Sequence, residues 1–96
     1  MSTKDAYKQK IEAEVELAMA KLAEFKAKAK ISSADARIKY ARQISKIEQA
    51  VDATKAKLQE LGEAGEGAWE KLKEGVESAW SSASTAVKDA AAKFKD

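Results

Sequence analysis

The sequence of 96 residues contains neither histidine nor cysteine, so the side chains that could do chemistry are serine, tyrosine, lysine and the carboxylates. Without an imidazole, no serine can be activated as in a Ser-His-Asp triad. The usual zinc ligands are missing, and so is the general base that titrates near neutral pH. This inventory argues against an enzyme, and we expect no catalytic residue, cofactor site or metal site.

Carboxylates at helical spacing are the remaining candidates for a site. Two carboxylates on one helix face can bind a divalent cation weakly, or share a proton if they are buried. Elsewhere in the chain, glutamate and lysine alternate four residues apart, as in Glu24 and Lys28, which is the ordinary pairing of a solvated helix surface. We therefore expect the carboxylates to be solvated too. The two groups are Glu12 with Glu16, and Glu70 with Glu74 and Glu77.

The composition predicts long helices in a single domain over residues 1–96. The chain has no proline and four glycines, and 35% of its residues are charged. Such a mixture is typical of long helices and coiled coils. The net charge of +2 gives no strong field toward nucleic acid. Residues 26–46 are locally basic, but they show neither helix-turn-helix spacing nor an aromatic platform, so nucleic-acid binding is not expected.

Large apolar residues recur along the chain in alternating steps of four and three. This spacing is typical of helices that pack through a coiled-coil seam. Each of three such rows covers roughly 28 residues, or about 42 Å of helix. We expect the rows to form an interaction seam. Its residues are Ile11, Val15, Leu22, Phe25, Tyr40, Ile44, Ile47, Val51, Leu58, Leu61, Trp69, Leu72, Val76, Trp80, Val87 and Phe94.

Two places could interrupt the helices. Three glycines fall between residues 62 and 67, and each costs about 1 kcal/mol in a helix interior. Gly62 follows the last apolar residue of its row, where a C-terminal cap is common. The second place is less clearly marked: Ser32 and Asp35 resemble a weakened capping box, but the apolar spacing continues through them.

We therefore predict an elongated all-α hairpin or coiled coil, with a long helix over about 4–61, a turn at 62–67 and a shorter helix over about 67–94. The alternative is a three-helix bundle with an extra turn at 31–34. The long helix would need another chain to cover its N-terminal half. Because much of the apolar content is alanine, self-association would add support to a small core, and we expect a homo-oligomer. Whether assembly is closed or filamentous stays open.

The segment 67–94 carries both tryptophans, Trp69 and Trp80, about three turns apart on one face of an amphipathic helix. Neighbouring small residues let helix backbones approach closely, so we expect this face to pack in the seam. In the alternative, the helix lies on a membrane surface with its aromatic residues in the interface. No stretch has the length of apolar sequence that spans a bilayer, and the N-terminus does not resemble a signal peptide. The expected location is the cytoplasm.

The stretch Gly-Ala-Trp-Glu-Lys-Leu-Lys-Glu-Gly-Val-Glu-Ser-Ala-Trp at 67–80 resembles a motif of a family of short bacterial coiled-coil proteins. These are usually described as stress-response proteins, after cyanobacterial members induced by salt or osmotic stress. The segments 34–40 and 56–61 fit the same pattern, whereas the serines at 32–33 depart from it. Residues 85–93 are also similar to desiccation-protective late-embryogenesis-type repeats. The resemblance implies a stress association, no known enzymatic activity and no functional residues to carry over.

The sequence thus predicts a non-enzymatic structural or interaction protein that self-associates and has a scaffolding or protective role under stress. The alternative is a peripheral protein that binds a lipid or membrane surface through the 67–94 helix. No feature of the sequence identifies a particular protein partner.

Overall fold

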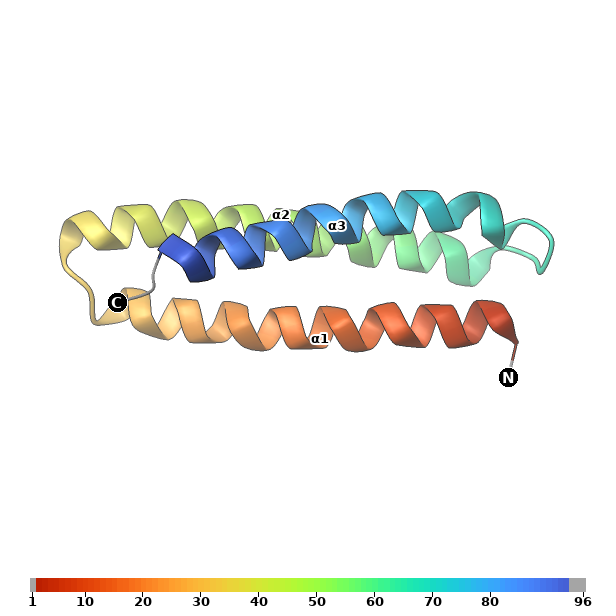
Figure 1. Ribbon diagram of the computed structural model, residues 1–96, viewed down its shortest axis with the longest axis horizontal. Coiled ribbons are helices and arrows are strands. Elements are labelled where there is room, and N and C mark those ends of the chain that lie inside the picture. The colour runs from red at the N-terminus through yellow and green to blue at the C-terminus, as the bar shows by residue number, and fades with distance from the viewer. Residues whose placement is uncertain (1, 94–96) are drawn as a thin grey trace.

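The computed structural model describes residues 2–93, which form three long helices (Figure 1). α1 spans Thr3–Lys30, α2 spans Ala34–Glu63 and α3 spans Trp69–Lys93. α2 runs antiparallel to its two neighbours, and the whole is a rod of 51 × 19 × 18 Å. The all-α prediction is confirmed for the described residues. Their arrangement is the three-helix bundle that the sequence left as the alternative.

The predicted continuous helix over 4–61 is wrong, because the chain reverses between α1 and α2. Ser33, and not Ser32, is the N-cap of α2, and its Oγ accepts a hydrogen bond from the Ala36 N–H at 3.3 Å. Ser32 Oγ donates to the Lys28 carbonyl at 2.7 Å. Backbone groups at helix ends lack partners within the helix, and the two serines supply some. The reversal also lets α1 bury its apolar row against its own chain.

The predicted turn at 62–67 is present but begins two residues later. α2 continues through Gly62 and ends at Glu63, and Ala64 is its C-cap with an extended backbone (φ −76°, ψ 146°). The prediction that Gly62 caps the helix is therefore wrong, and no described residue has a positive φ. The chain then turns, with the Ala68 N–H donating to the Gly65 carbonyl at 3.0 Å. α3 starts at Trp69, close to the predicted position.

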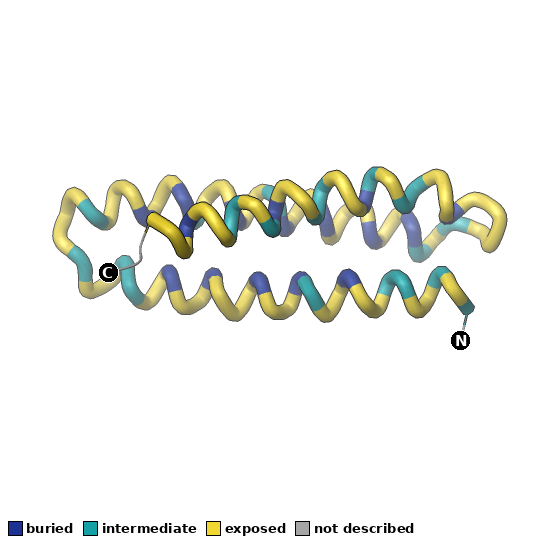
Figure 2. The backbone as a smooth tube through the Cα atoms, in the orientation of Figure 1, coloured by how far each residue is buried: buried dark blue, intermediate teal, exposed yellow. Residues whose placement is uncertain are grey.

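A single apolar core runs along the axis of the bundle. Figure 2 shows the buried positions of α1 as one row on the side that faces α2 and α3. The largest fully buried side chains are Ile47, Leu61, Val76 and Thr54. On α3, Ala83 is also fully buried, and such small residues permit close approach of two helices. α2 and α3 share the most extensive contact, and the contact between α1 and α3 is the smallest.

Candidate interaction surfaces

The predicted seam residues meet one another inside a single chain. Those buried in the bundle are Ile11, Val15, Leu22, Phe25, Tyr40, Ile47, Val51, Leu58, Leu61, Trp69 and Val76. Those half-buried at its margins are Ile44, Leu72, Trp80 and Val87. Phe94 lies outside the described residues. Because the three rows cover each other, their burial is accounted for without a second chain, and a partner would contact another surface.

The end of the bundle where α1 begins is tied together by lysines of α1. Lys4 Nζ donates to the Ala64 carbonyl at 2.8 Å and lies 3.4 Å from the Gly62 carbonyl. α2 has no basic residue in its own last turn, so this charge from α1 meets the negative end of the α2 dipole. A Cβ atom at Gly62 would come within 3.0 Å of Lys8 Nζ. Lys8 thus crosses α2 close to Gly62, a contact that only the fold reveals.

An aromatic contact lies beside this lysine cap and was not predicted from the sequence. The ring centroids of Tyr7 and Trp69 are 5.9 Å apart, and Lys73 Nζ lies 5.1 Å from the Tyr7 centroid. The Tyr7 hydroxyl is buried and lies near the Glu77 carboxylate. Burial, and then the charge of Glu77, raise its pKa to about 12. The ring contacts pack the beginning of α1 against the beginning of α3, and we assign this cluster no chemical role.

The carboxylates considered in the sequence do not assemble into a site. Glu12, Glu16, Glu70, Glu74 and Glu77 are all exposed residues. Within residues 2–93, no group of three or more acidic side chains is arranged to hold a metal ion. These carboxylates lie at the surface, and Glu77 also acts on the Tyr7 hydroxyl.

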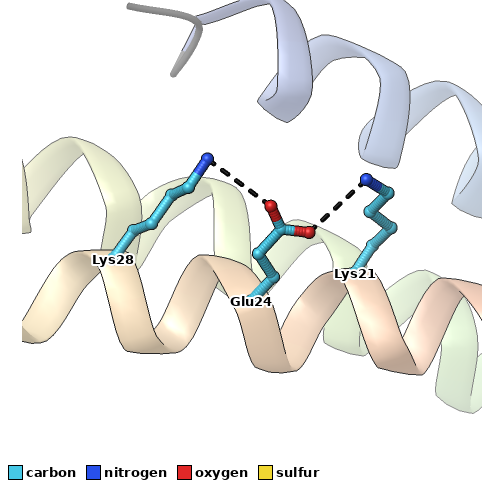
Figure 3. A network of polar contacts seen from close by, with 3 residues as sticks. All are labelled: Lys21, Glu24 and Lys28. Atoms are coloured by element: carbon cyan, nitrogen blue, oxygen red, sulfur yellow. Dashed lines mark hydrogen bonds and ion pairs between the residues drawn. The ribbon is translucent and has the colours of Figure 1, made fainter.

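One exposed carboxylate on α1 takes part in a small ionic network, drawn in Figure 3. Glu24 lies between Lys21, at 3.4 Å, and Lys28, at 3.6 Å. The hydrogen bond from Lys21 and the positive charge of both lysines lower the pKa of Glu24. Exposed pairs of this kind contribute little to stability. Their importance here is that they place alternating charges along one side of α1.

The outward side of α1 carries a second row with the four-three spacing of a coiled coil, here named the outer α1 face. All of its residues are exposed, and Leu17 and Ile31 keep 71% and 88% of their surface. Isolated apolar residues on a surface are common, but these two occupy the same row. Its members are Ala6, Lys10, Ala13, Leu17, Ala20, Glu24, Ala27 and Ile31. This row can be found in the sequence, but its alanines and its two charged positions make it unlike an apolar row.

A shallow, open groove of about 570 Å³ lies between α2 and α3. Amides, hydroxyls and one pair of opposite charges offer hydrogen bonds there, but the groove lacks the apolar enclosure of most small-molecule sites. Its lining residues are Gln43, Lys46, Gln49, Ala50, Ser81, Ser82, Thr85, Ala86 and Asp89. We assign it no ligand.

The apolar face of α3, considered for membrane contact, is turned into the bundle. Trp69 keeps only 5% of its surface and Val76 none. Insertion of this face into a lipid interface would require α3 to leave α1 and α2. Among the described residues, no helix is long and apolar enough to cross a bilayer.

Comparison with known proteins adds no relative. No protein-family model matches the chain, and neither the curated proteins nor the solved structures give a significant match.

Proposed function

We propose that this protein is a non-enzymatic structural or interaction protein that self-associates. The observation that carries the proposal is the outer α1 face. Leu17 and Ile31 stay exposed there although the chain has already closed its own core. A row of apolar and small residues at the four-three spacing is typical of a helix that packs against another helix. The lack of histidine and cysteine in the sequence supports a role without catalysis.

Light scattering over a dilution series, with circular dichroism on the same samples, tests self-association. One chain has a mass of 10.4 kDa. We expect a larger species that dissociates on dilution while its helicity stays constant, because each chain already folds around its own core. A mass of one chain at every concentration would refute self-association. Helicity that falls with dissociation would show instead that folding depends on the partner.

We further propose that this assembly has a scaffolding or protective role under stress. The support is the resemblance of residues 67–80 to the stress-response family described above. In the source organism, the abundance of the protein should rise after salt or osmotic shock, and a deletion strain should recover more slowly. Unchanged abundance together with normal recovery would contradict this role without affecting the proposal of self-association.

A further inference from the structure

We propose that a second copy of the chain binds the outer α1 face, with the two α1 helices antiparallel. This inference rests on the proposed self-association and specifies the surface and the orientation. Over Ala6–Ile31 the row extends about 38 Å at 1.5 Å per residue. That length is most of the 51 Å long axis of the molecule. Both helices would therefore be in contact along most of the rod.

The order of side-chain sizes along the row fits an antiparallel pair. When Leu17 lies opposite the partner's Ala20, every other layer also joins one longer side chain to an alanine. The remaining layers are Lys10 with the partner's Ala27, Glu24 with the partner's Ala13, and Ile31 with the partner's Ala6. Helices approach more closely where a small residue faces a large one. A two-fold axis repeats each of these layers, so the contact closes as a dimer.

Charge decides between the antiparallel and the parallel orientation. In the antiparallel pair, Lys10 lies about one turn from the partner's Glu24, a contact that occurs twice. In the parallel pair, Lys10 would face the partner's Lys10 and Glu24 would face the partner's Glu24. Like charges in the seam disfavour an alignment. Lys10 and Glu24 are both exposed, and Glu24 keeps 47% of its side chain accessible for such a contact.

Two single-cysteine variants measure the orientation, because the chain has no cysteine of its own. Gln9→Cys and Ala23→Cys place spin labels at exposed positions on the same flank of the row. In the antiparallel dimer, the two labels are offset along the helix axis by about 28 Å at position 9 and about 14 Å at position 23. Pulsed electron paramagnetic resonance should find the longer distance at position 9. Equal distances at the two positions would indicate a parallel pair and overturn the inference.

Charge reversal provides an independent test of the same contact. Lys10→Glu and Glu24→Lys should each weaken the dimer about tenfold, and the double variant should recover most of that loss. In a parallel pair the double variant would only exchange one like-charge contact for another, and no recovery would follow. Circular dichroism of each variant confirms that the helices are intact, which matters because Glu24 also pairs within its own chain.

The variant Leu17→Glu distinguishes a wrong contact surface from a wrong proposal of self-association. It should raise the dissociation constant at least a hundredfold, since it places a charge at the centre of the contact. Ile38→Glu is the matched control, because Ile38 is an exposed apolar residue on α2 with 56% of its surface accessible, and it should leave the dimer unchanged. A dimer that survives Leu17→Glu keeps the proposed self-association but excludes the outer α1 face. A native chain that is always monomeric refutes both.

Discussion

Replacing Ser32 and Ser33 together with alanine tests why the chain reverses between α1 and α2. The Ser33 Oγ accepts from the Ala36 N–H, and the Ser32 Oγ donates to the Lys28 carbonyl. Loss of a serine N-cap costs about 1 kcal/mol, and loss of one neutral hydrogen bond adds about 1 kcal/mol. We expect the free energy of unfolding to fall by about 2 kcal/mol, measured by urea denaturation.

The same substitution also favours the continuous helix, because alanine is a better helix former than serine. At high protein concentration we expect some chains to straighten through residues 31–33 and exchange α1 in a domain-swapped dimer. Combining the change with Leu17→Glu removes the contact of the outer α1 face, so that light scattering reports the swapped species alone. Ser78→Ala on α3 is the control, since Ser78 is exposed, and it should change stability by less than about 0.5 kcal/mol. An equally small effect of the double serine variant would refute the capping argument.

Three further predictions follow from buried or bridging polar groups. Lys4→Met keeps the aliphatic stem but removes the hydrogen bond to the Ala64 carbonyl. Thermal unfolding should therefore show a loss of stability of about 1 kcal/mol. Unchanged stability would show that the lysine does not cap α2. Thr54→Val replaces a fully buried hydroxyl that bonds only within its own helix. Urea denaturation should show that the free energy of unfolding rises by up to about 1 kcal/mol. A loss above that size would mean that the hydrogen bond of the hydroxyl outweighs the cost of burying it. The pKa of Tyr7 is raised from 10.0 to about 12, so the folded state favours the neutral phenol. The contribution of this preference to stability is full below pH 10 and is lost as the pH rises from 10 to 12. Tyr7→Phe should therefore lose less stability than the native chain between pH 9 and pH 11 in matched urea denaturation, and parallel losses would contradict the assigned shift.

The apolar spacing predicted the helices and most of the core, because a helix buries residues at steps of three and four wherever it packs. It failed at residues 31–33, where the same spacing runs through a chain reversal. The spacing of apolar residues reflects which side of a helix is buried. It does not indicate whether the backbone groups at a helix end have hydrogen-bond partners. The hydroxyls of Ser32 and Ser33 supply those partners, and their effect is local and polar.

The contacts between helices could not be predicted from the sequence for a different reason. Lys4 and Ala64 are distant along the chain, and only the packing of α1 against the end of α2 brings them together. Tyr7 was absent from the predicted seam because its contact with Trp69 likewise depends on which helix ends meet. The outer α1 face was visible as a pattern, but an alanine-rich row indicates an exposed face only once the opposite row is known to be buried.

The unequal contacts of α1 also bear on the order in which the bundle forms and opens. Both connections are short, but α2 and α3 share the largest contact, whereas α1 touches α3 least. Contacts between sequence neighbours close with little loss of chain entropy. Of the two neighbouring pairs, α2 and α3 make the larger contact, so their hairpin can form early and present a groove to α1. In the folded protein, the amide hydrogens of α1 would then exchange with solvent before those of the hairpin. The helix that carries the proposed dimer contact is thus also the one that we expect to detach first from the bundle.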